Sequence, residues 1–374
     1  MAFRKKNSKD LILSIIAHPL TIAPRPMNSA IIFGQEGYSV LLIGYRNENQ
    51  KKFETLGKGA KIFRISLKSR RIKVGAIRQL FSVLEFVIVA TKLINRTSPK
   101  FIILFNEIAN IILRFSTTNA IKISWLLEFP EKYNHSIGES LMHWISIKTW
   151  KNADAYVFPT ITRKAMAAVL EPTIISKPSF IVHNTPLPIE IPIPTTTSEN
   201  GNSARSQLKK WKESGKIIII YAGAVGNRYG WDTLIRTVAN LENPYRLMIF
   251  GKKHPLGIGE FTEAIKDTKF PTNIVWVDSV HYFELNSLIS MGDIGFVHYL
   301  GDNLNTYFSS PGKLYEYLKS GLAILTDVEA CIAEDIRINK AGILFDKPLK
   351  HSELEIILQN YSTEQINIMK KNSF

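Results

Sequence analysis

Apolar runs of strand length recur along this chain with helix-length segments between them, and no other feature of the sequence constrains the fold as strongly. The first run, residues 11–17, ends at a turn, as expected of a strand buried on both faces of a parallel sheet. A helix over 28–35 and a strand over 38–44 are expected next. Later strands of this half are expected at 101–105, 121–127 and 155–158. Strands separated by helix-length segments are typical of a doubly wound α/β domain.

Residues 186–215 interrupt this alternation with linker-like sequence rich in proline, threonine and serine. The pattern restarts at 216–223, and its later strands are expected at 245–251, 274–277, 294–297, 323–325 and 342–345. We therefore predict an α/β protein of two Rossmann-like, doubly wound domains facing a cleft, with a ligand at the carboxyl ends of the strands. The predicted boundaries are 1–187 for the N-terminal domain, 188–215 for a linker and short helix, 216–350 for the C-terminal domain and 351–374 for a C-terminal helix, whose return to the N-terminal domain is left open.

The composition indicates a globular protein. A length of 374 residues, 45% hydrophobic and 21% charged, fits two domains that each bury a core. The single cysteine, Cys331, cannot form an internal disulfide, which favours a reducing compartment and excludes cysteine-rich metal sites. We expect no signal peptide, because the first apolar run is followed by His18-Pro19. No stretch reaches the ~18 apolar residues of a spanning helix, so the protein is not expected to cross a membrane. The reducing compartment that the single cysteine favours is expected to be the cytoplasm.

The formal net charge of +15 predicts attraction to an anionic partner without identifying it. Much of the positive charge lies in 51–78, immediately before an apolar, helix-like segment over 80–94. This order is typical of a surface that rests on anionic lipid headgroups. A buried core helix with a solvated basic face explains the same pattern, and the residues alone do not separate the two.

The segment 307–321 carries the most specific signal for a ligand. Pro311 and Gly312 open a helix-like stretch, where unpaired backbone N–H groups and the positive end of the helix dipole favour a diphosphate. Lys313 adds a full charge, and Glu316, one turn later, is placed to accept hydrogen bonds from ribose hydroxyls. A surface turn followed by an ordinary amphipathic helix is the alternative.

The run from Ser310 to Tyr317 resembles the Ser-Pro-Asn-Lys-Leu-x-Glu-Tyr motif of family 4 glycosyltransferases of the GT-B fold, with Gly312 in the position of the asparagine. The resemblance assigns four of its residues to the donor: Ser310, Gly312, Leu314 and Glu316. It gives Lys313 a catalytic role.

A glycine-rich turn after the first strand of the C-terminal half is a second phosphate candidate. Gly223 and Gly226 let the backbone approach an anion, and Arg228 can neutralise it. The turn resembles the family's Gly-x-x-x-x-x-(Arg/Lys)-Gly loop, whose basic residue contacts the donor pyrophosphate. Here Tyr229, and not a basic residue, stands directly before Gly230. Arg228 is one position earlier, so it can replace the family's basic residue only because it lies nearby in the sequence. An ordinary turn between a strand and a helix is the alternative.

Two strand ends of the C-terminal half also match the family. Gly251 resembles a strand-end glycine that passes near the donor, and Val277 begins a segment that resembles the family's backbone contacts to the base. Phe308 stands where many members carry a second glutamate that touches the donor sugar. The subgroup with Ser-Pro-x-Lys often lacks that glutamate and has an asparagine and an aromatic residue nearby, as Asn305 and Tyr307 are here.

The N-terminal half is expected to hold the acceptor, and its signals are weaker. Arg25 lies in a Pro-Arg-Pro opening that resembles the family's Pro-Arg-Val. Glu128 follows the strand at 121–127, where the family often has an acid or a histidine near the reacting sugar. His18 and Asn106 follow two other strands. Each also has a purely structural explanation: Arg25 as a cation in a helix-capping loop, Glu128 as a loop glutamate, and His18 and Asn106 as polar residues that bind no ligand.

The resemblance implies a hexosyltransferase that moves a sugar from a nucleoside diphosphate donor to a hydroxyl of a glycan or lipid-linked glycan. It implies retention at the anomeric carbon through a short-lived ion pair, with the departing phosphate helping to deprotonate the acceptor. Two helix starts, together with Lys313 and Arg228, would stabilise the leaving diphosphate. By family analogy the acceptor belongs to bacterial surface polysaccharide synthesis at the inner face of the membrane.

No metal and no cofactor other than the donor is expected. The sequence has no Asp-x-Asp pair, and its eight histidines show no metal-binding spacing. Three alternatives stay open: a nucleotide-sugar epimerase on the same fold, a nucleic-acid-binding protein suggested by the charge, and an inactive donor-binding module suggested by Phe308 and Tyr229. The expected partners are a nucleotide-sugar donor, a glycan or lipid-linked acceptor and an anionic membrane surface, and nucleic acid is not expected to be one of them.

Overall fold

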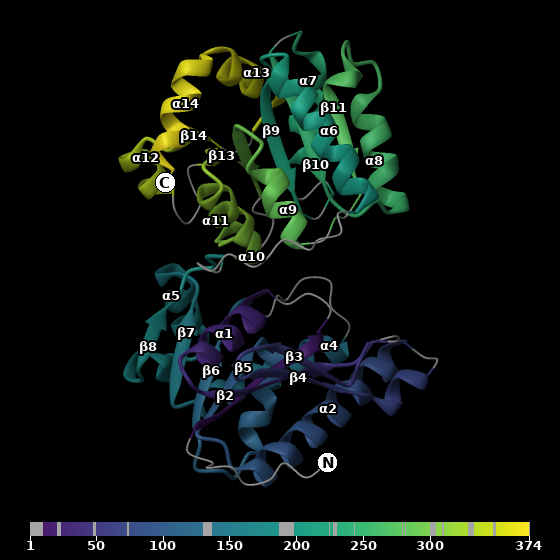
Figure 1. The fold of residues 1–374 in the computed structure, drawn as a ribbon. Helices are drawn as coiled ribbons and strands as arrows, with labels where there is room; N and C mark the ends of the chain where they lie inside the picture. The colour runs from purple at the N-terminus through teal and green to yellow at the C-terminus, as the bar shows by residue number, and fades with distance from the viewer. Residues whose placement is uncertain are drawn as a thin grey trace. The chain divides into compact units, whose positions relative to one another are not determined.

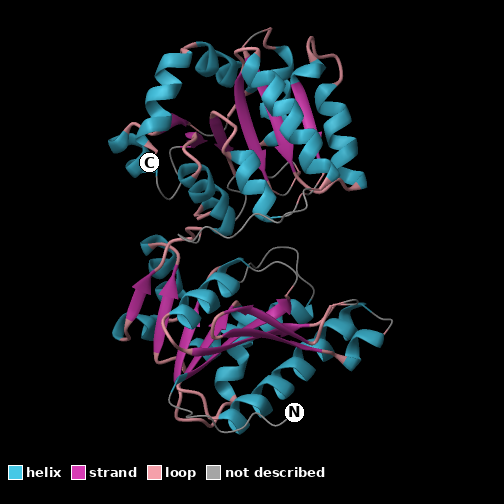
Figure 2. Ribbon diagram, viewed as in Figure 1, coloured by secondary structure: helices cyan, strands magenta, loops and turns pink. Residues whose placement is uncertain are grey.

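The chain divides into two compact units, Met1–His183 and Asn184–Phe374, each built around its own sheet with helices packed on it (Figure 1). The computed structural model describes residues 10–20, 24–47, 50–72, 75–129, 137–186, 198–223, 225–226, 230–242, 244–278, 280, 282–299, 304–308, 310–327, 333–346 and 349–373. Strands and helices alternate along both units (Figure 2). This confirms the predicted class of two α/β domains.

The sheet of the first unit has the strand order β3-β4-β2-β1-β5-β6-β7-β8. Its strands are β1 (Leu11–Pro19), β2 (Ser39–Tyr45), β3 (Phe53–Gly57), β4 (Ala60–Ile65), β5 (Phe101–Phe105), β6 (Ile121–Trp125), β7 (Ala155–Phe158) and β8 (Ser179–Ile181). β1 lies between β2 and β5 and pairs with both in parallel. A central strand covered on both faces requires apolar side chains on both, which explains its unbroken apolar character.

The helices of the first unit are α1 (Pro24–Gln35), η2 (Lys68–Arg71), α2 (Gly75–Thr97), α3 (Glu107–Asn110), η3 (Ile111–Arg114), α4 (Ile137–Trp150), α5 (Ile161–Leu170) and η4 (Pro172–Ser176). Two apolar clusters form its core. The helix expected at 28–35 begins four residues earlier, at a proline, whose fixed backbone angle suits a first helical position. The antiparallel hairpin of β3 and β4 was not expected from the sequence.

The sheet of the second unit has the order β11-β10-β9-β12-β13-β14, and all its strand pairs are parallel. Its strands are β9 (Ile217–Ala222), β10 (Tyr245–Phe250), β11 (Ile274–Val277), β12 (Ile294–Val297), β13 (Ala323–Asp327) and β14 (Gly342–Phe345). The direction of the strand order reverses between β9 and β12. Sheets of this kind bind ligands at the carboxyl ends of the strands beside such a reversal.

The helices of the second unit are α6 (Glu199–Glu213), α7 (Trp231–Asn240), α8 (Pro255–Ile265), η6 (Pro271–Asn273), α9 (Tyr282–Ile289), α10 (Leu304–Tyr307), α11 (Gly312–Lys319), α12 (Ala333–Asn339), α13 (His351–Gln359) and α14 (Thr363–Asn372). α6 is longer than the expected linker helix and belongs to this core, since Leu208 and Trp211 pack with β9. Within the described residues, no helix is long and apolar enough to cross a membrane.

The C-terminal helices pack within the second unit. α13 lies against α7, and α14 lies against β13 and β14. Leu354, Leu358 and Ile366 are buried in the same apolar cluster as the sheet. These apolar side chains therefore complete the core of the second unit, and the return of segment 351–374 to the N-terminal domain, left open from the sequence, stays untested.

Candidate functional site

The carboxyl ends of β9 and β12 bring together two residues that the sequence separates widely. Gly223 directly follows β9, and Lys313 extends from the first turn of α11. A Cβ placed on Gly223 would lie 3.9 Å from Lys313 Cδ and 4.0 Å from its Nζ. The two phosphate candidates predicted from the sequence thus meet at one place, beside the reversal in strand order.

Aromatic rings surround the Lys313 amine. Its Nζ lies 4.5 Å from the ring centroid of Tyr221 and 5.2 Å from that of Tyr299. Burial lowers the pKa of Lys313 to about 7, and the nearby carboxylate of Glu316 partly offsets this decrease. An anion arriving at this amine would favour its charged form and raise the pKa again.

Tyr317, in the second half of α11, fixes this helix against the sheet. Its hydroxyl accepts a hydrogen bond of 2.7 Å from the N–H of Ala222, the last residue of β9. Burial raises the pKa of Tyr317, so the hydroxyl stays protonated. A Cβ on Gly295 of β12 would stand 2.3 Å from the Tyr317 ring, so the ring fills the space that a side chain would take. The position of Lys313 relative to Gly223 is therefore set by packing.

The loop before α11 is braced from the start of the second unit. The carbonyl of Ser310 accepts a hydrogen bond from Asn184 Nδ2, and Ser310 Oγ lies 3.4 Å from the hydroxyl of Tyr315. Ser310 and Asn184 are both buried. A Cβ on Gly312 would lie 3.8 Å from the Asn184 carbonyl oxygen. Asn184 was not expected to contribute, since nothing in a lone asparagine before a linker indicates such a partner.

Leu314 is fully buried, and its N–H already donates to the carbonyl of Pro311 at 3.1 Å. Its predicted backbone contact with a donor would therefore have to replace this bond. Glu316 is half-buried one turn into α11, as expected, and acts electrostatically on Lys313. The amides of α11 that can serve an anion are thus those of its first two residues.

Gly251 supports the turn that carries Gly223. A Cβ on Gly251 would stand 2.5 Å from the carbonyl oxygen of Gly223 and 2.6 Å from Val225 Cγ2, closer than real side chains approach. The N–H of Gly251 donates to the carbonyl of Val277 at 3.2 Å. Val277 is buried in β11, and its contact with a nucleotide base stays a prediction.

Gly230 is the residue directly before α7 and has a φ of +59°, a backbone conformation that favours glycine. A Cβ on Gly230 would also stand 2.2 Å from His298 Cδ2. His298 is buried, and its Nδ1 lies 3.4 Å from a carboxylate oxygen of Asp327. Neither partner was expected from the sequence. A Cβ on Gly226 would lie 3.9 Å from Glu260 Oε2, a carboxylate that opposes a phosphate at that point.

Arg228 and Tyr229 lie outside the described residues. The predicted role of Arg228 in neutralising the diphosphate therefore stays a prediction.

The four acceptor-side candidates of the first unit occupy strand ends or a helix start. His18 lies near the end of β1 and is exposed, Glu128 is exposed after β6, and Arg25 is half-buried in α1. Asn106 follows β5 with φ of +70°; its Oδ1 accepts from the N–H of Ala109 at 3.0 Å, and its Nδ2 donates to the carbonyl of Ala17 at 3.4 Å. Asn106 thus caps α3 and ties it to the end of β1.

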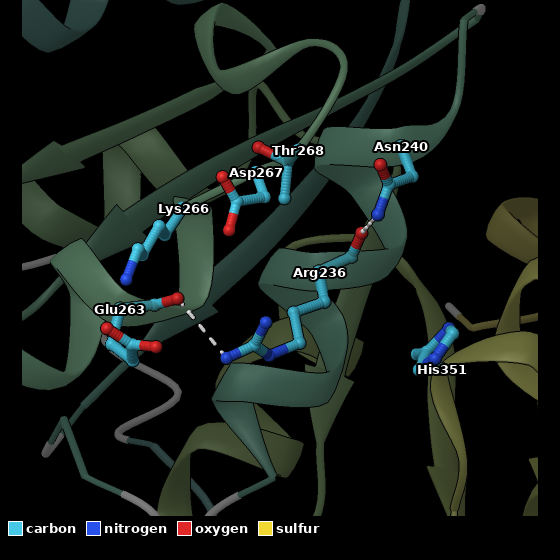
Figure 3. A pocket seen from close by; sticks show the side chains of 7 residues that line it. All are labelled: Arg236, Asn240, Glu263, Lys266, Asp267, Thr268 and His351. Atoms are coloured by element: carbon cyan, nitrogen blue, oxygen red, sulfur yellow. Dashed lines mark hydrogen bonds between the residues drawn. The ribbon is translucent and has the colours of Figure 1, made fainter.

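Figure 3 shows a pocket of about 210 Å³ in the second unit. It is lined by Arg236, Asn240, Glu263, Lys266, Asp267, Thr268 and His351. Arg236 donates to the carbonyl of Glu263 at 3.2 Å across it. The pocket lies toward the carboxyl end of α7, whereas Gly230 and the candidate site lie at the start of that helix.

No protein-family model and no curated protein sequence matches this chain. Solved structures match it along almost its whole length. Sucrose-phosphate synthase from Thermosynechococcus elongatus has a TM-score of 0.72 at 12% identity, covering 97% of this chain and 93% of that one. WaaG, a glycosyltransferase involved in lipopolysaccharide biosynthesis, has 0.66 at 12%, covering 96% and 94%. HepE of Anabaena in complex with UDP-glucose has 0.69 at 10%, covering 97% and 93%.

These identities are too low to show a shared activity, but the TM-scores and the coverage show a shared architecture. The strand order of the second unit, with its reversal between β9 and β12, agrees with the Rossmann-like domain predicted from the sequence. The chain therefore has the GT-B fold of two Rossmann-like α/β domains.

Proposed function

We propose that this protein is a glycosyltransferase that moves a sugar from a nucleoside diphosphate donor to a hydroxyl of a glycan or lipid-linked glycan. One observation carries the proposal: Lys313 lies against Gly223 at the reversal in strand order, beside the start of α11. A glycine turn, a helix start and a cation meeting at one point form a site for a diphosphate.

The donor reacts by cleavage of the bond between its anomeric carbon and the β-phosphate oxygen. Lys313 and the first amides of α11 stabilise the negative charge that builds on the departing diphosphate, which is where preorganised charge contributes most. The acceptor oxygen then bonds to the anomeric carbon on the face that the diphosphate leaves, and its proton passes to the departing phosphate. This sequence retains the configuration and needs neither a metal nor a dedicated base.

Other residues have supporting roles in this proposal. Gly223 and Gly251 shape the diphosphate turn, and Glu316 binds the ribose. Arg228 adds charge near the diphosphate. Glu128 acts catalytically near the reacting sugar, and the strand-end residues His18 and Asn106, with Arg25 at the start of α1, bind the acceptor.

The donor nucleotide is the first property to test. HepE was solved with UDP, with UDP and glucose, and with UDP-glucose, which makes UDP and UDP-glucose the leading probes. We propose that the acceptor belongs to surface polysaccharide synthesis and that the protein acts at the inner face of the cell membrane.

A thermal-shift series with UDP, GDP and their sugars tests the donor site, and hydrolysis of the stabilising sugar nucleotide without acceptor tests the chemistry. We expect one nucleoside diphosphate to raise the melting temperature and slow hydrolysis of its sugar to follow, both weakened in Lys313→Ala. Conversion of the donor to an epimer would support the epimerase instead. Stabilisation by none of these ligands would overturn the proposal.

A further inference from the structure

Helix α2 of the first unit, labelled in Figure 1, carries apolar side chains both on a buried side and on an exposed side. One face is buried in the core and includes Phe86, Val87, Ala90 and Ile94. The other leaves large apolar side chains in solvent: Leu80 is 40% exposed, Phe81 50%, Leu84 46% and Ile88 52%. Their spacing places Phe81, Leu84 and Ile88 along one side of the helix. The two explanations of this segment, a core helix and a surface helix, thus both apply.

A basic turn is fixed beside this exposed face. The carboxylate of Glu85 accepts from the backbone N–H of Lys68 at 2.9 Å, from that of Ser69 at 2.9 Å and from Ser69 Oγ at 2.6 Å. Ser69 Oγ also lies 3.0 Å from Ser82 Oγ. Burial alone would raise the pKa of Glu85, but the bonds from Ser69 and Lys68 hold it below its usual value. Glu85 therefore joins the turn η2 to α2.

The charge around this face is almost entirely positive. Residues 60–97 contain nine Lys or Arg residues and one acid, Glu85. Arg64 is paired with Glu54 at 2.7 Å, and Arg70 lies over the Tyr45 ring at 5.4 Å. Lys68, Arg71 and Arg78 are exposed.

We infer that η2 and the exposed side of α2 form a surface that docks on an anionic lipid bilayer. Leu84 and Ile88 would enter the boundary between headgroups and acyl chains, while Lys68 and Arg71 contact the phosphates. The inference specifies how the proposed membrane association arises and rests on that part of the proposed function. It does not depend on the donor chemistry.

Two other occupants fit the surface less well. A second copy docking on the same face by two-fold symmetry would place two strongly basic turns against each other. Nucleic acid would match the charge, but the exposed aliphatic side chains of Leu80, Leu84 and Ile88 gain little from phosphates or bases. A bilayer with anionic headgroups matches both the charge and the apolar side chains.

Co-sedimentation with phosphatidylcholine vesicles, with and without phosphatidylserine, tests the docking. Wild-type protein should bind only the anionic vesicles, and added salt should weaken the binding. Lys68→Gln with Arg71→Gln should lower the partition coefficient roughly thirtyfold, because each basic residue near such a surface contributes about a factor of five. Leu84→Ser with Ile88→Ser should also lower it, without removing the salt dependence.

Matched controls test whether the location of the removed charges and apolar side chains matters, and not only their number. Lys210→Gln with Lys212→Gln removes two exposed charges from α6, and Val169→Ser with Ile175→Ser removes two exposed apolar side chains from the first unit. Both controls should bind vesicles as wild type does. Hydrolysis of the sugar nucleotide, measured without vesicles, should stay unchanged in all these variants, so a failure of docking is distinguished from a failure of the donor site.

Vesicle binding equal to that of the wild type in both Lys68→Gln with Arg71→Gln and Leu84→Ser with Ile88→Ser would overturn the inference. So would a dimer in sedimentation velocity that Leu84→Ser with Ile88→Ser dissociates, or RNA binding at physiological salt that exceeds vesicle binding and is lost in Lys68→Gln with Arg71→Gln.

Discussion

The candidate residues of the second unit pack against one another, whereas those of the first unit either have a structural role or are exposed. In the second unit, Gly223, Gly251 and Lys313 form one compact arrangement, and the absence of side chains on the glycines is what makes it possible. In the first unit, Asn106 already has a structural task, since it caps α3 and reaches the end of β1. Glu128 and His18 are exposed at strand ends.

We interpret this difference as follows: a diphosphate site uses mainly backbone groups, whereas an acceptor site uses mainly side chains. Backbone sites require glycines and helix starts at fixed positions, and these can be recognised in the sequence. A side-chain site can use any polar residue that the fold brings to the right edge. The predictions below test whether the contrast between the units is real.

The largest effect is expected from Lys313→Ala. Loss of a preorganised charge at the departing diphosphate should raise the barrier by about 2.7–4 kcal/mol, which lowers kcat roughly 100-fold to 1,000-fold. Steady-state hydrolysis of the sugar nucleotide measures this. Lys319→Ala, at the exposed end of the same helix, is the matched control and should keep kcat within a small factor of wild type. An unchanged kcat in Lys313→Ala would remove Lys313 from the reaction.

The affinity for the diphosphate should depend on pH through the same amine. The pKa of Lys313 is lowered to about 7 by burial, so the amine is charged below that pH and a bound anion raises its pKa. Affinity for UDP should therefore be full below about pH 7 and fall above it, by at most about tenfold per pH unit. Calorimetry between pH 7 and 9.5 measures the slope and the proton uptake. Lys313→Met should bind weakly with no such slope; an equal slope in both proteins would assign the titration elsewhere.

Gly251→Ala should damage the diphosphate turn. The added Cβ would lie 2.5 Å from the Gly223 carbonyl oxygen, so the backbone must move. Overpacking of this kind costs about 1–3 kcal/mol of stability, and binding of UDP should weaken with it. Urea unfolding and calorimetry measure the two effects. Gly259→Ala is the control, because a Cβ there meets nothing within 4 Å. Wild-type affinity in Gly251→Ala would show that the turn is not part of the site.

The smallest effect is expected in the first unit. Asn106→Ala should lower the free energy of unfolding by about 1 kcal/mol through loss of the cap, whereas Asn106→Asp keeps an acceptor oxygen for the Ala109 N–H and should be milder. Urea unfolding measures both. Donor hydrolysis should stay at the wild-type rate in the two variants. A raised KM for acceptor in stable Asn106→Asp would show that this residue also binds substrate and would weaken the contrast between the units.

The sequence predicts the parts of this molecule that local pattern determines. The buried strands β1 and β9 were expected because continuous apolar runs have few other solutions in a globular chain. Lys313 and Gly223 were expected because each follows a recognisable break. The antiparallel β3–β4 hairpin was missed because its charged, half-exposed residues obscure the alternation, although the glycines at 57 and 59 offered a turn signal.

Contacts between distant segments could not be predicted from the sequence. The hydrogen bond from the Ala222 N–H to the Tyr317 hydroxyl, the one from Asn184 to Ser310 and the pair of His298 with Asp327 all depend on tertiary packing. An aromatic residue in an amphipathic helix indicates burial, and nothing in the local pattern says which strand its hydroxyl will meet. The lowered pKa of Lys313 has the same origin, because it arises from burial of an amine that lies over the ring of Tyr221 in β9 and the ring of Tyr299, which follows β12.

The aromatic surroundings of Lys313 also bear on how the protein would end each catalytic cycle. A lysine held permanently charged would retain the nucleoside diphosphate product and would attract the many other phosphorylated metabolites around it. Close to neutral pH, this amine is only partly charged in the empty site, so the free energy of protonating it offsets part of the binding free energy of any diphosphate, and the product is held less tightly. Weaker retention of other phosphates and faster release of the product nucleotide would then come from one side chain and the two rings beside it.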